Sequence, residues 1–320
     1  MKFNLYSIFL IIIVLVSCSK EDDFMKSSLK DFSYSKYVYK IIPGTEGYWL
    51  ITRTVQNPEC ESCSNLNLIE GLAFFYNDDF FAKDKIGFLL DAEEQNNSLI
   101  TITSNEVLSF TKNLQKTVLK TSENSEIYKL MDLDRNGKCW ILSSKGFFNL
   151  QNDRVSFQNN QSFIDFEISD DNTFWVATND TVFHVSSSSI EKFSIQEISG
   201  NLTSSIYNLS IDKNNDVWLN ISDRVFKLNN NSWNDVKAGN YLGGNFQTIP
   251  YMDVDKSGKL WLAEKNYQSF TDLHCFDGSK WTSFTITPPL DNWINDIESA
   301  EPGFIWIATD YGLKKVPLDL

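Results

Sequence analysis

The chain has 320 residues and a formal net charge of −14, with 42 acidic residues against 28 basic ones. Nucleic acids and anionic membrane surfaces attract basic patches, so this balance argues against nucleic acid as a partner. Aromatic residues make up 14 % of the chain and prolines number only 7, which suits many short β-strands.

Residues 1–17 are predicted to be a targeting segment that the mature protein lacks. Lys2 supplies a positive start, and the apolar run Ile8–Val16 is shorter than the roughly 20 residues of a membrane-spanning helix. The run ends in Leu15-Val16-Ser17-Cys18, which resembles the lipobox of bacterial lipoproteins. This resemblance implies that Cys18 becomes the first mature residue and carries a lipid. An ordinary secretory signal that happens to end at a cysteine is the alternative.

Residues 18–28 are expected to form an acidic tether. The sequence Ser19-Lys20-Glu21-Asp22-Asp23 resembles the export tag of lipoproteins displayed on the outer face of Gram-negative outer membranes. A merely solvated tether is the alternative. We therefore expect a lipid-anchored protein of the bacterial outer membrane, whose membrane contact is the N-terminal lipid. Removal of residues 1–17 takes away one charge, that of Lys2, and leaves a mature net charge of −15.

A tryptophan recurs at one position of a repeated phrase, as in LSIDKNNDVWLN at Leu209–Asn220 and MDVDKSGKLWLA at Met252–Ala263. The five tryptophans, separated by 35, 43, 43 and 45 residues, are Trp140, Trp175, Trp218, Trp261 and Trp306. A period of roughly 40 residues built from short strands and turns is typical of a β-propeller. One tryptophan per repeat at one offset predicts packing between blades rather than ligand binding.

The repeat around Trp218 shows the expected blade. Its predicted strands are 206–211, 217–221, 225–228 and 232–236, and Asp212–Asn215 forms a tight polar turn between the first two. Four antiparallel strands in about 43 residues make one blade. At the turn, three residues before each tryptophan, stand Gly137, Asn172, Asn215, Gly258 and Gly303.

Two earlier units lack the full phrase. Ile100 takes the tryptophan position within 97–103, and Trp49 takes it within 47–52, which brings the count to seven. The last unit has three strands, near 294–299, 304–309 and 312–316, so a strand at Leu29–Ser33 is expected to complete it. The prediction is an all-β, seven-bladed propeller of four-stranded antiparallel blades over residues 29–320, monomeric, with six blades as the alternative.

The phrases at 134–141 and 255–262, with Thr309-Asp310-Tyr311-Gly312-Leu313, resemble the two-component-regulator propeller repeat. The resemblance covers most of residues 40–316 and is strongest over 127–316. In that family the repeats form the periplasmic sensing region of hybrid histidine kinases. We expect here a stand-alone propeller without the kinase, so the sensor-kinase function does not carry over.

Four cysteines follow Cys18. Cys60 and Cys63 are expected to form a local disulfide in an oxidising compartment or to remain thiols, whereas Cys139 and Cys275 lie in strand patterns and are expected in the core. Zinc would need further ligands, and the two histidines, His184 and His274, stand alone. The sequence predicts neither a metal site nor a cofactor.

Acidic residues recur eight residues before the tryptophans, on the innermost strands. The residues at this offset are Asp132, Glu167, Ser210, Asp253 and Glu298. They are expected near the central channel, where they accept hydrogen bonds from neighbouring blades or, alternatively, converge on a cation or polar ligand. The Asp-rich turns 132–137 and 253–258 are interpreted as hairpin turns rather than calcium loops, because a strand follows each.

Aromatic residues outside the repeat pattern gather in loops expected at one mouth of the propeller. They are Tyr241, Phe246, Tyr267, Trp293 and Tyr311. Exposed aromatics there would stack on sugar rings or contact a protein partner, and packing of the loops among themselves is the alternative.

No local enzyme motif is present, including the nucleophile elbow, the P-loop and the zincin helix. We therefore predict a module that binds a protein partner or an extracellular glycan. The alternatives are a propeller glycosidase or lyase with a carboxylate site, and an accessory component of a sensory system.

Overall fold

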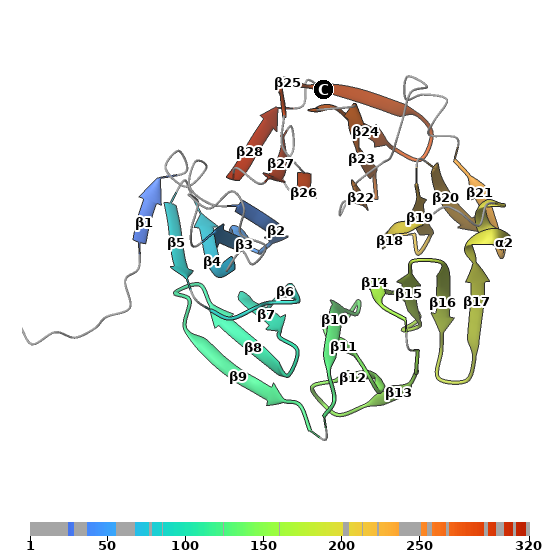
Figure 1. Cartoon of the computed structure of the whole chain (residues 1–320), viewed down its shortest axis with the longest axis horizontal. Coiled ribbons are helices and arrows are strands. Elements are labelled where there is room, and N and C mark those ends of the chain that lie inside the picture. The colour runs from blue at the N-terminus through green and yellow to red at the C-terminus, as the bar shows by residue number, and fades with distance from the viewer. Residues whose placement is uncertain are drawn as a thin grey trace, which may run out of the picture.

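The computed structural model is a ring of seven antiparallel sheets arranged as a β-propeller (Figure 1). The described residues are 25–28, 37–55, 68–76, 79–84, 86–123, 125–159, 161–200, 205–212, 214–222, 224–236, 251–254, 258–266, 269–290, 294–298, 304–309 and 312–317. Within them, five sheets have four strands, the first has five and the last has three. The predicted seven-bladed all-β propeller is confirmed, and the six-bladed alternative is wrong.

Each blade runs from an innermost to an outermost strand in chain order. Blade 1 contains β2 (Tyr37–Pro43), β3 (Tyr48–Val55), β4 (Leu68–Tyr76) and β5 (Asp79–Asp84), with β1 (Met25–Ser28) outside β5. Blade 2 contains β6 (Asp91–Gln95), β7 (Ser98–Ile102), β8 (Glu106–Thr111) and β9 (Lys116–Thr121). Blade 3 contains β10 (Tyr128–Leu133), β11 (Cys139–Ser143), β12 (Gly146–Asn149) and β13 (Arg154–Ser156).

The remaining four blades follow the same order. Blade 4 contains β14 (Phe163–Ile168), β15 (Phe174–Thr178), β16 (Thr181–Val185) and β17 (Ile190–Ser194), followed by the helix α2 (Ile195–Ser199). Blade 5 contains β18 (Ile206–Ile211), β19 (Val217–Ile221), β20 (Arg224–Asn229) and β21 (Ser232–Asp235). Blade 6 contains β22 (Tyr251–Val254), β23 (Leu260–Asn266), β24 (Ser269–Phe276) and β25 (Trp281–Leu290). Blade 7 contains β26 (Ile294–Glu298), β27 (Phe304–Thr309) and β28 (Gly312–Pro317).

The repeated tryptophans are core residues, as predicted. All five are at most 7 % exposed, and each belongs to a hydrophobic cluster shared with the next blade. Trp218, for example, packs with Met252, Leu260 and Leu262 of blade 6. Ile100 takes the same place between blades 2 and 3, and Trp49 takes it between blades 1 and 2. One apolar layer therefore fills each of the seven junctions between blades.

In blades 3 and 5 the turn before the tryptophan makes a second contact with it. In blade 5, Asp212 Oδ1 accepts hydrogen bonds from the backbone N–H groups of Asn214 (2.9 Å) and Asp216 (3.0 Å). Its Oδ2 accepts one from the Trp218 indole (3.1 Å), and Asp134 holds Trp140 in the same way in blade 3. The aspartate of the repeat thus shapes the hairpin and satisfies a buried indole N–H at the same time.

Backbone geometry explains the residues at the turn. Gly137, Asn172, Asn215 and Gly258 all have positive φ, a conformation that glycine and asparagine tolerate best. The first Asp-rich turn joins the strands β10 and β11, as expected of a hairpin. Residues 255–257 of the second turn, and Gly303, lie outside the described residues.

The ring closes where blade 7 meets blade 1. Asp296 Oδ2 accepts a hydrogen bond from the backbone N–H of Ile41 (2.6 Å), and Asn295 Nδ2 donates to the Val38 carbonyl (2.9 Å). Trp306 packs against the rings of Tyr48 and Phe75. The N-terminal strand β1 pairs with β5, on the outer edge of blade 1, whereas the predicted closing strand at Leu29–Ser33 lies outside the described residues.

Two further findings concern membrane spans and thiols. The described ranges contain no helix with the length and apolar character needed to cross a bilayer. Cys139 and Cys275 are buried free thiols, as expected of core residues, and burial raises the pKa of Cys139. Cys60 and Cys63 lie outside the described residues, so their disulfide stays a prediction.

Candidate functional site

The innermost strands surround the propeller axis, with β2, β6, β10, β14, β18, β22 and β26 nearest the centre (Figure 1). The residue paired with each repeat tryptophan, or with its counterpart, forms the first axial ring. Its members are Ile42, Glu93, Asp132, Glu167, Ser210, Asp253 and Glu298. The residues two positions earlier form the second axial ring: Lys40, Asp91, Leu130, Asp165, Asn208, Tyr251 and Asp296. Eight of these fourteen positions are carboxylic acids.

Several ring carboxylates connect one blade to the next. The Oδ2 atoms of these aspartates accept a hydrogen bond from a backbone N–H on the innermost strand of the following blade. The pairs are Asp91 with Met131 (3.0 Å), Asp132 with Ile168 (2.8 Å), Asp165 with Leu209 (3.0 Å) and Asp296 with Ile41 (2.6 Å). Such a hydrogen bond contributes about 0.5–1.5 kcal/mol to stability, and about 1.5–3 kcal/mol where the carboxylate is charged. The rings therefore contribute to cohesion between blades, whatever else they bind.

Lys40 is the one basic member of the two rings. Its Nζ lies 2.6 Å from Asp91 Oδ1 and 3.6 Å from Glu93 Oε1. Burial lowers the pKa of Lys40, but the charges of Asp91 and Glu93 outweigh it, and the pKa lies well above its usual range. Lys40 thus stays protonated and offsets part of the negative charge at the axis.

The remaining carboxylates crowd one another across the axis. Burial, followed by the charges of Asp132, Asp165 and Asp253, raises the pKa of Glu167 well above its ordinary value. Asp253 lies on blade 6 and Glu167 on blade 4. Their charges therefore interact past blade 5, which carries the uncharged Ser210 at this position of the ring. Burial also raises the pKa of Glu93 to about 7, and Lys40 opposes that rise.

These shifts define what the rings do chemically. Glu93, and Asp165 with a pKa of about 6, exchange protons near neutral pH. Tyr251 donates a hydrogen bond to Asp296, and burial raises the pKa of Tyr251, so this phenol remains protonated. Among the described residues, no group of three or more His, Cys, Asp or Glu side chains is placed to hold a metal ion.

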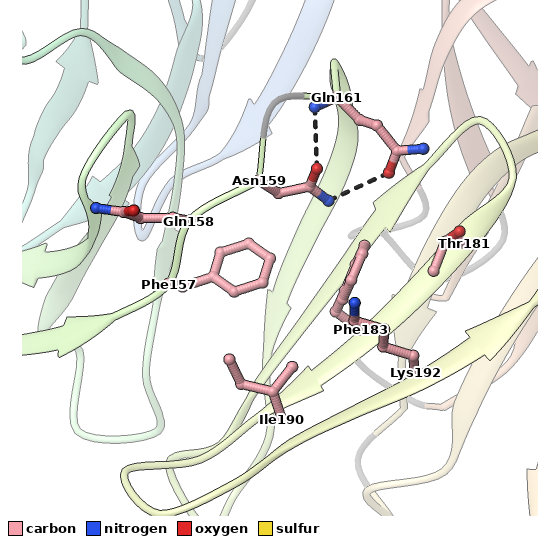
Figure 2. Close-up of a pocket in the computed structure, with 8 residues that line it drawn as sticks. All are labelled: Phe157, Gln158, Asn159, Gln161, Thr181, Phe183, Ile190 and Lys192. Atoms are coloured by element: carbon pink, nitrogen blue, oxygen red, sulfur yellow. Dashed lines mark hydrogen bonds between the residues drawn. The ribbon is translucent and has the colours of Figure 1, made fainter.

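A surface pocket lies between blades 3 and 4, away from the axis (Figure 2). Its volume is about 370 Å³. Phe157 and Phe183 meet edge to face at the floor, 5.4 Å between ring centroids. The rim carries polar or aliphatic side chains, namely Gln158, Asn159, Gln161, Thr181, Ile190 and Lys192.

The polar rim is ordered by its own hydrogen bonds. Asn159 Nδ2 donates to Gln161 Oε1 (3.2 Å), and Asn159 Oδ1 accepts from the backbone N–H of Gln161 (3.0 Å), as Figure 2 shows. Gln161 Nε2 donates in turn to Asp180 Oδ1 (3.0 Å). The pocket therefore combines an apolar floor with fixed amide groups, the composition of many ligand sites.

Sequence analysis predicted part of the axial rings and did not predict the pocket. Asp132, Glu167, Asp253 and Glu298 do lie in the first axial ring, but the second ring was missed, although it follows from the strand alternation two residues earlier. The pocket was missed because its lining combines repeat positions, such as Phe183 and Lys192, with the irregular connection that contains Phe157, Asn159 and Gln161. The predicted mouth residues Tyr241, Phe246, Tyr267, Trp293 and Tyr311, and the lipidation residue Cys18, lie outside the described residues.

The sequence matches none of the protein-family models and none of the curated proteins with which it was compared. Solved structures do match. The virginiamycin B lyase of Staphylococcus aureus, solved with quinupristin, has a TM-score of 0.62 at 11 % identity, covering 92 % of this chain and 99 % of the lyase. YCF48 bound to a D1 peptide has a TM-score of 0.65 at 10 % identity, covering 93 % and 95 % of the two chains.

A third structure belongs to a larger protein. It is the extracellular domain of a B. thetaiotaomicron protein named as a hybrid two-component system, with a TM-score of 0.64 and 16 % identity. The match covers 92 % of this chain and 41 % of that one. The three proteins differ in function, and identities this low show the propeller fold alone.

Proposed function

We propose that this chain is a lipid-anchored propeller of the bacterial outer membrane that binds a protein partner or an extracellular glycan. The pocket between blades 3 and 4 carries this proposal: it is open, and one side of it is lined by an irregular connection that contains Phe157, Gln158, Asn159 and Gln161. The repeat residues, in contrast, are buried in the junctions between blades. This division is typical of scaffolds that vary their loops for recognition.

The anchor is the part of the proposal that rests on the sequence. Leu15–Cys18 has the lipobox pattern, and an acidic tract follows it. The likeness to an extracellular propeller domain agrees with an exported protein. Metabolic labelling with a radioactive fatty acid is expected to tag the wild type and to spare Cys18→Ser. Equal labelling of the two would refute the anchor.

Binding without turnover is tested on the full-length chain purified in detergent. We expect electrophoretic retardation by at least one member of a panel of polysaccharides and envelope proteins, with no release of sugar reducing ends and no cleavage of the protein. Turnover that a single carboxylate substitution abolishes would contradict the binding-module proposal.

An enzyme is the second candidate, and the axial rings are the observation that favours it. A glutamic acid with a pKa of about 7 beside a lysine is suited to general acid–base chemistry, and one structural neighbour is a lyase. If the chain were such an enzyme, Glu93→Gln would abolish product release while leaving the fold intact by circular dichroism. An accessory sensory role stays a prediction from the sequence.

A further inference from the structure

Three successive junctions between blades each have a groove on the outer half of the blades. The residue after the repeat tryptophan pairs with a phenylalanine on the third strand, which is Phe148 in blade 3, Phe183 in blade 4 and Phe226 in blade 5. All three rings are buried. A cation lies over each of them, namely Arg154 at 5.0 Å, Lys192 at 5.6 Å and Arg224 at 4.6 Å. Each of the three grooves therefore has a buried ring beneath a cation. In blade 5 that cation comes from the third strand, and Asp235 takes the position of Arg154 and Lys192.

The groove between blades 2 and 3 is filled by an acidic side chain. Glu126 is buried there and accepts hydrogen bonds from Arg154 Nη1 (3.0 Å) and Nη2 (3.1 Å). Ser143 Oγ donates a third bond to Glu126 at 2.5 Å. Arg154 is the residue that pairs with Phe148 on the outermost strand. A bidentate ion pair of this kind fixes both partners and occupies the space over the ring.

The groove between blades 4 and 5 is filled by a helix. The short helix α2 places Ile195 and Ile198 in the hydrophobic cluster that contains Phe226. Arg224 ties the helix down, because its Nη1 donates to the Ser199 carbonyl (3.1 Å) and its Nη2 to Asp235 (2.8 Å). Here the occupant is aliphatic, and it again comes from the connection between two blades.

The groove between blades 3 and 4 has the same frame but is only partly filled, because Phe157 follows the outermost strand as Ile195 does in the next groove and packs on Phe183. The strand register places Gln161 where blade 3 has Glu126, and Lys192 where blade 3 has Arg154. Gln161 is turned to Asp180, and no carboxylate of the described residues lies within ion-pair distance of Lys192. Ile190 is exposed at the edge of the pocket, and Phe157 closes its floor (Figure 2).

We propose that this groove binds a segment of a partner protein that places an aliphatic side chain on Phe157, Phe183 and Ile190 and a carboxylate beside Lys192. The two filled grooves supply the argument. One holds a carboxylate, Glu126, where the open groove has Gln161, and the other holds a second aliphatic side chain, Ile198, beside the residue that matches Phe157. The fixed amides of Asn159 and Gln161 are available for the backbone of the bound segment. The inference rests on the proposed binding function and narrows it to one site and one ligand class.

The test uses a heptapeptide display library in which every member contains Ile or Leu together with Asp or Glu. The library is panned on the full-length chain in detergent, and selected peptides are titrated by fluorescence polarisation. A triple variant, Gln161→Glu with Asp180→Lys and Lys192→Arg, copies Glu126, Lys145 and Arg154 of the filled groove. Thr178 already stands at the position of Ser143 to donate its hydroxyl.

We expect micromolar peptides whose affinity falls by about tenfold or more in the triple variant and in Lys192→Glu. Lys116→Glu, the same charge change on the outermost strand of blade 2, is the matched control and should leave binding unchanged. Unchanged melting temperatures show that the variants fold. Peptides that bind all variants equally, or a library that yields no binder, would overturn the proposal. A glycan that binds the wild type but not the triple variant would overturn the peptide assignment while leaving the binding function intact.

Discussion

The hydrogen bond between Asp212 and Trp218 offers a direct test of how the repeat holds its shape. Trp218 is 2 % exposed, so its indole N–H has no access to bulk water. Asp212 is the acceptor for that N–H and for two backbone amides of the turn. Removing the carboxylate leaves a buried donor unsatisfied, whereas the turn amides regain water.

The magnitude follows from these contacts. An unsatisfied buried donor costs about 1–3 kcal/mol, and a hydrogen bond to a charged acceptor contributes about 1.5–3 kcal/mol. We expect Asp212→Ala to lower the free energy of unfolding by about 3 kcal/mol. Trp218→Phe removes the same bond and part of the ring contacts, and should cost about 2–3 kcal/mol. The double variant should show a coupling of about 1.5 kcal/mol or more, because both single changes remove one interaction.

The assay is urea unfolding followed by circular dichroism for the wild type, both single variants and the double variant. Asp170→Ala is the control, since Asp170 forms an exposed ion pair with Arg135 that is expected to contribute under about 1 kcal/mol. A coupling below about 0.5 kcal/mol would refute the argument that the carboxylate holds the indole.

Three further predictions concern the axis, the closure and the mouth. Because the pKa of Glu93 is raised to about 7, the contribution of Glu93 to stability should be fully present below about pH 4.5 and be lost as pH rises through about 7, a change of at most about 3 kcal/mol. Glu93→Gln should remove this part of the dependence of melting temperature on pH, and an unchanged slope would contradict the shift. Asp296→Ala should speed amide hydrogen exchange in blades 1 and 7 more than Asp132→Ala does in blades 3 and 4, since the latter pair stays joined by the chain; equal effects would contradict a closure held by Asp296. Trp293→Ala should leave folding intact and weaken binding if the ligand also reaches the mouth, whereas unfolding would assign Trp293 to the core.

The strands were predictable because the same pattern of strand and turn residues recurs in several repeats. In blade 5 the expected strands 206–211 and 217–221 match β18 and β19, and the other two differ by a residue or so at their ends. The alternation of apolar residues along a strand fixes which side chains face a neighbouring blade. A buried tryptophan at one offset then follows for every repeat.

The contacts between repeats were harder to predict. Asp91 and Asp165 bond the next blade through a register that includes β-bulges near the start of several inner strands, and sequence spacing does not reveal those. The open groove depends on Gln161 and Lys192, which occupy the positions that Glu126 and Arg154 have in blade 3. This correspondence can be seen only when the two blades are aligned by strand register. Such irregular connections do not repeat along the chain, so periodicity cannot predict them.

One measurement tests the central claim, that the propeller binds its ligand without changing it. The full-length chain in detergent is incubated with the polysaccharide panel and the peptide library, and the retained material is identified by mass spectrometry. The account predicts that a ligand is retained and recovered with its mass unchanged. Recovery of a ligand cleaved or otherwise altered by the wild type, and unaltered from Glu93→Gln, would contradict it.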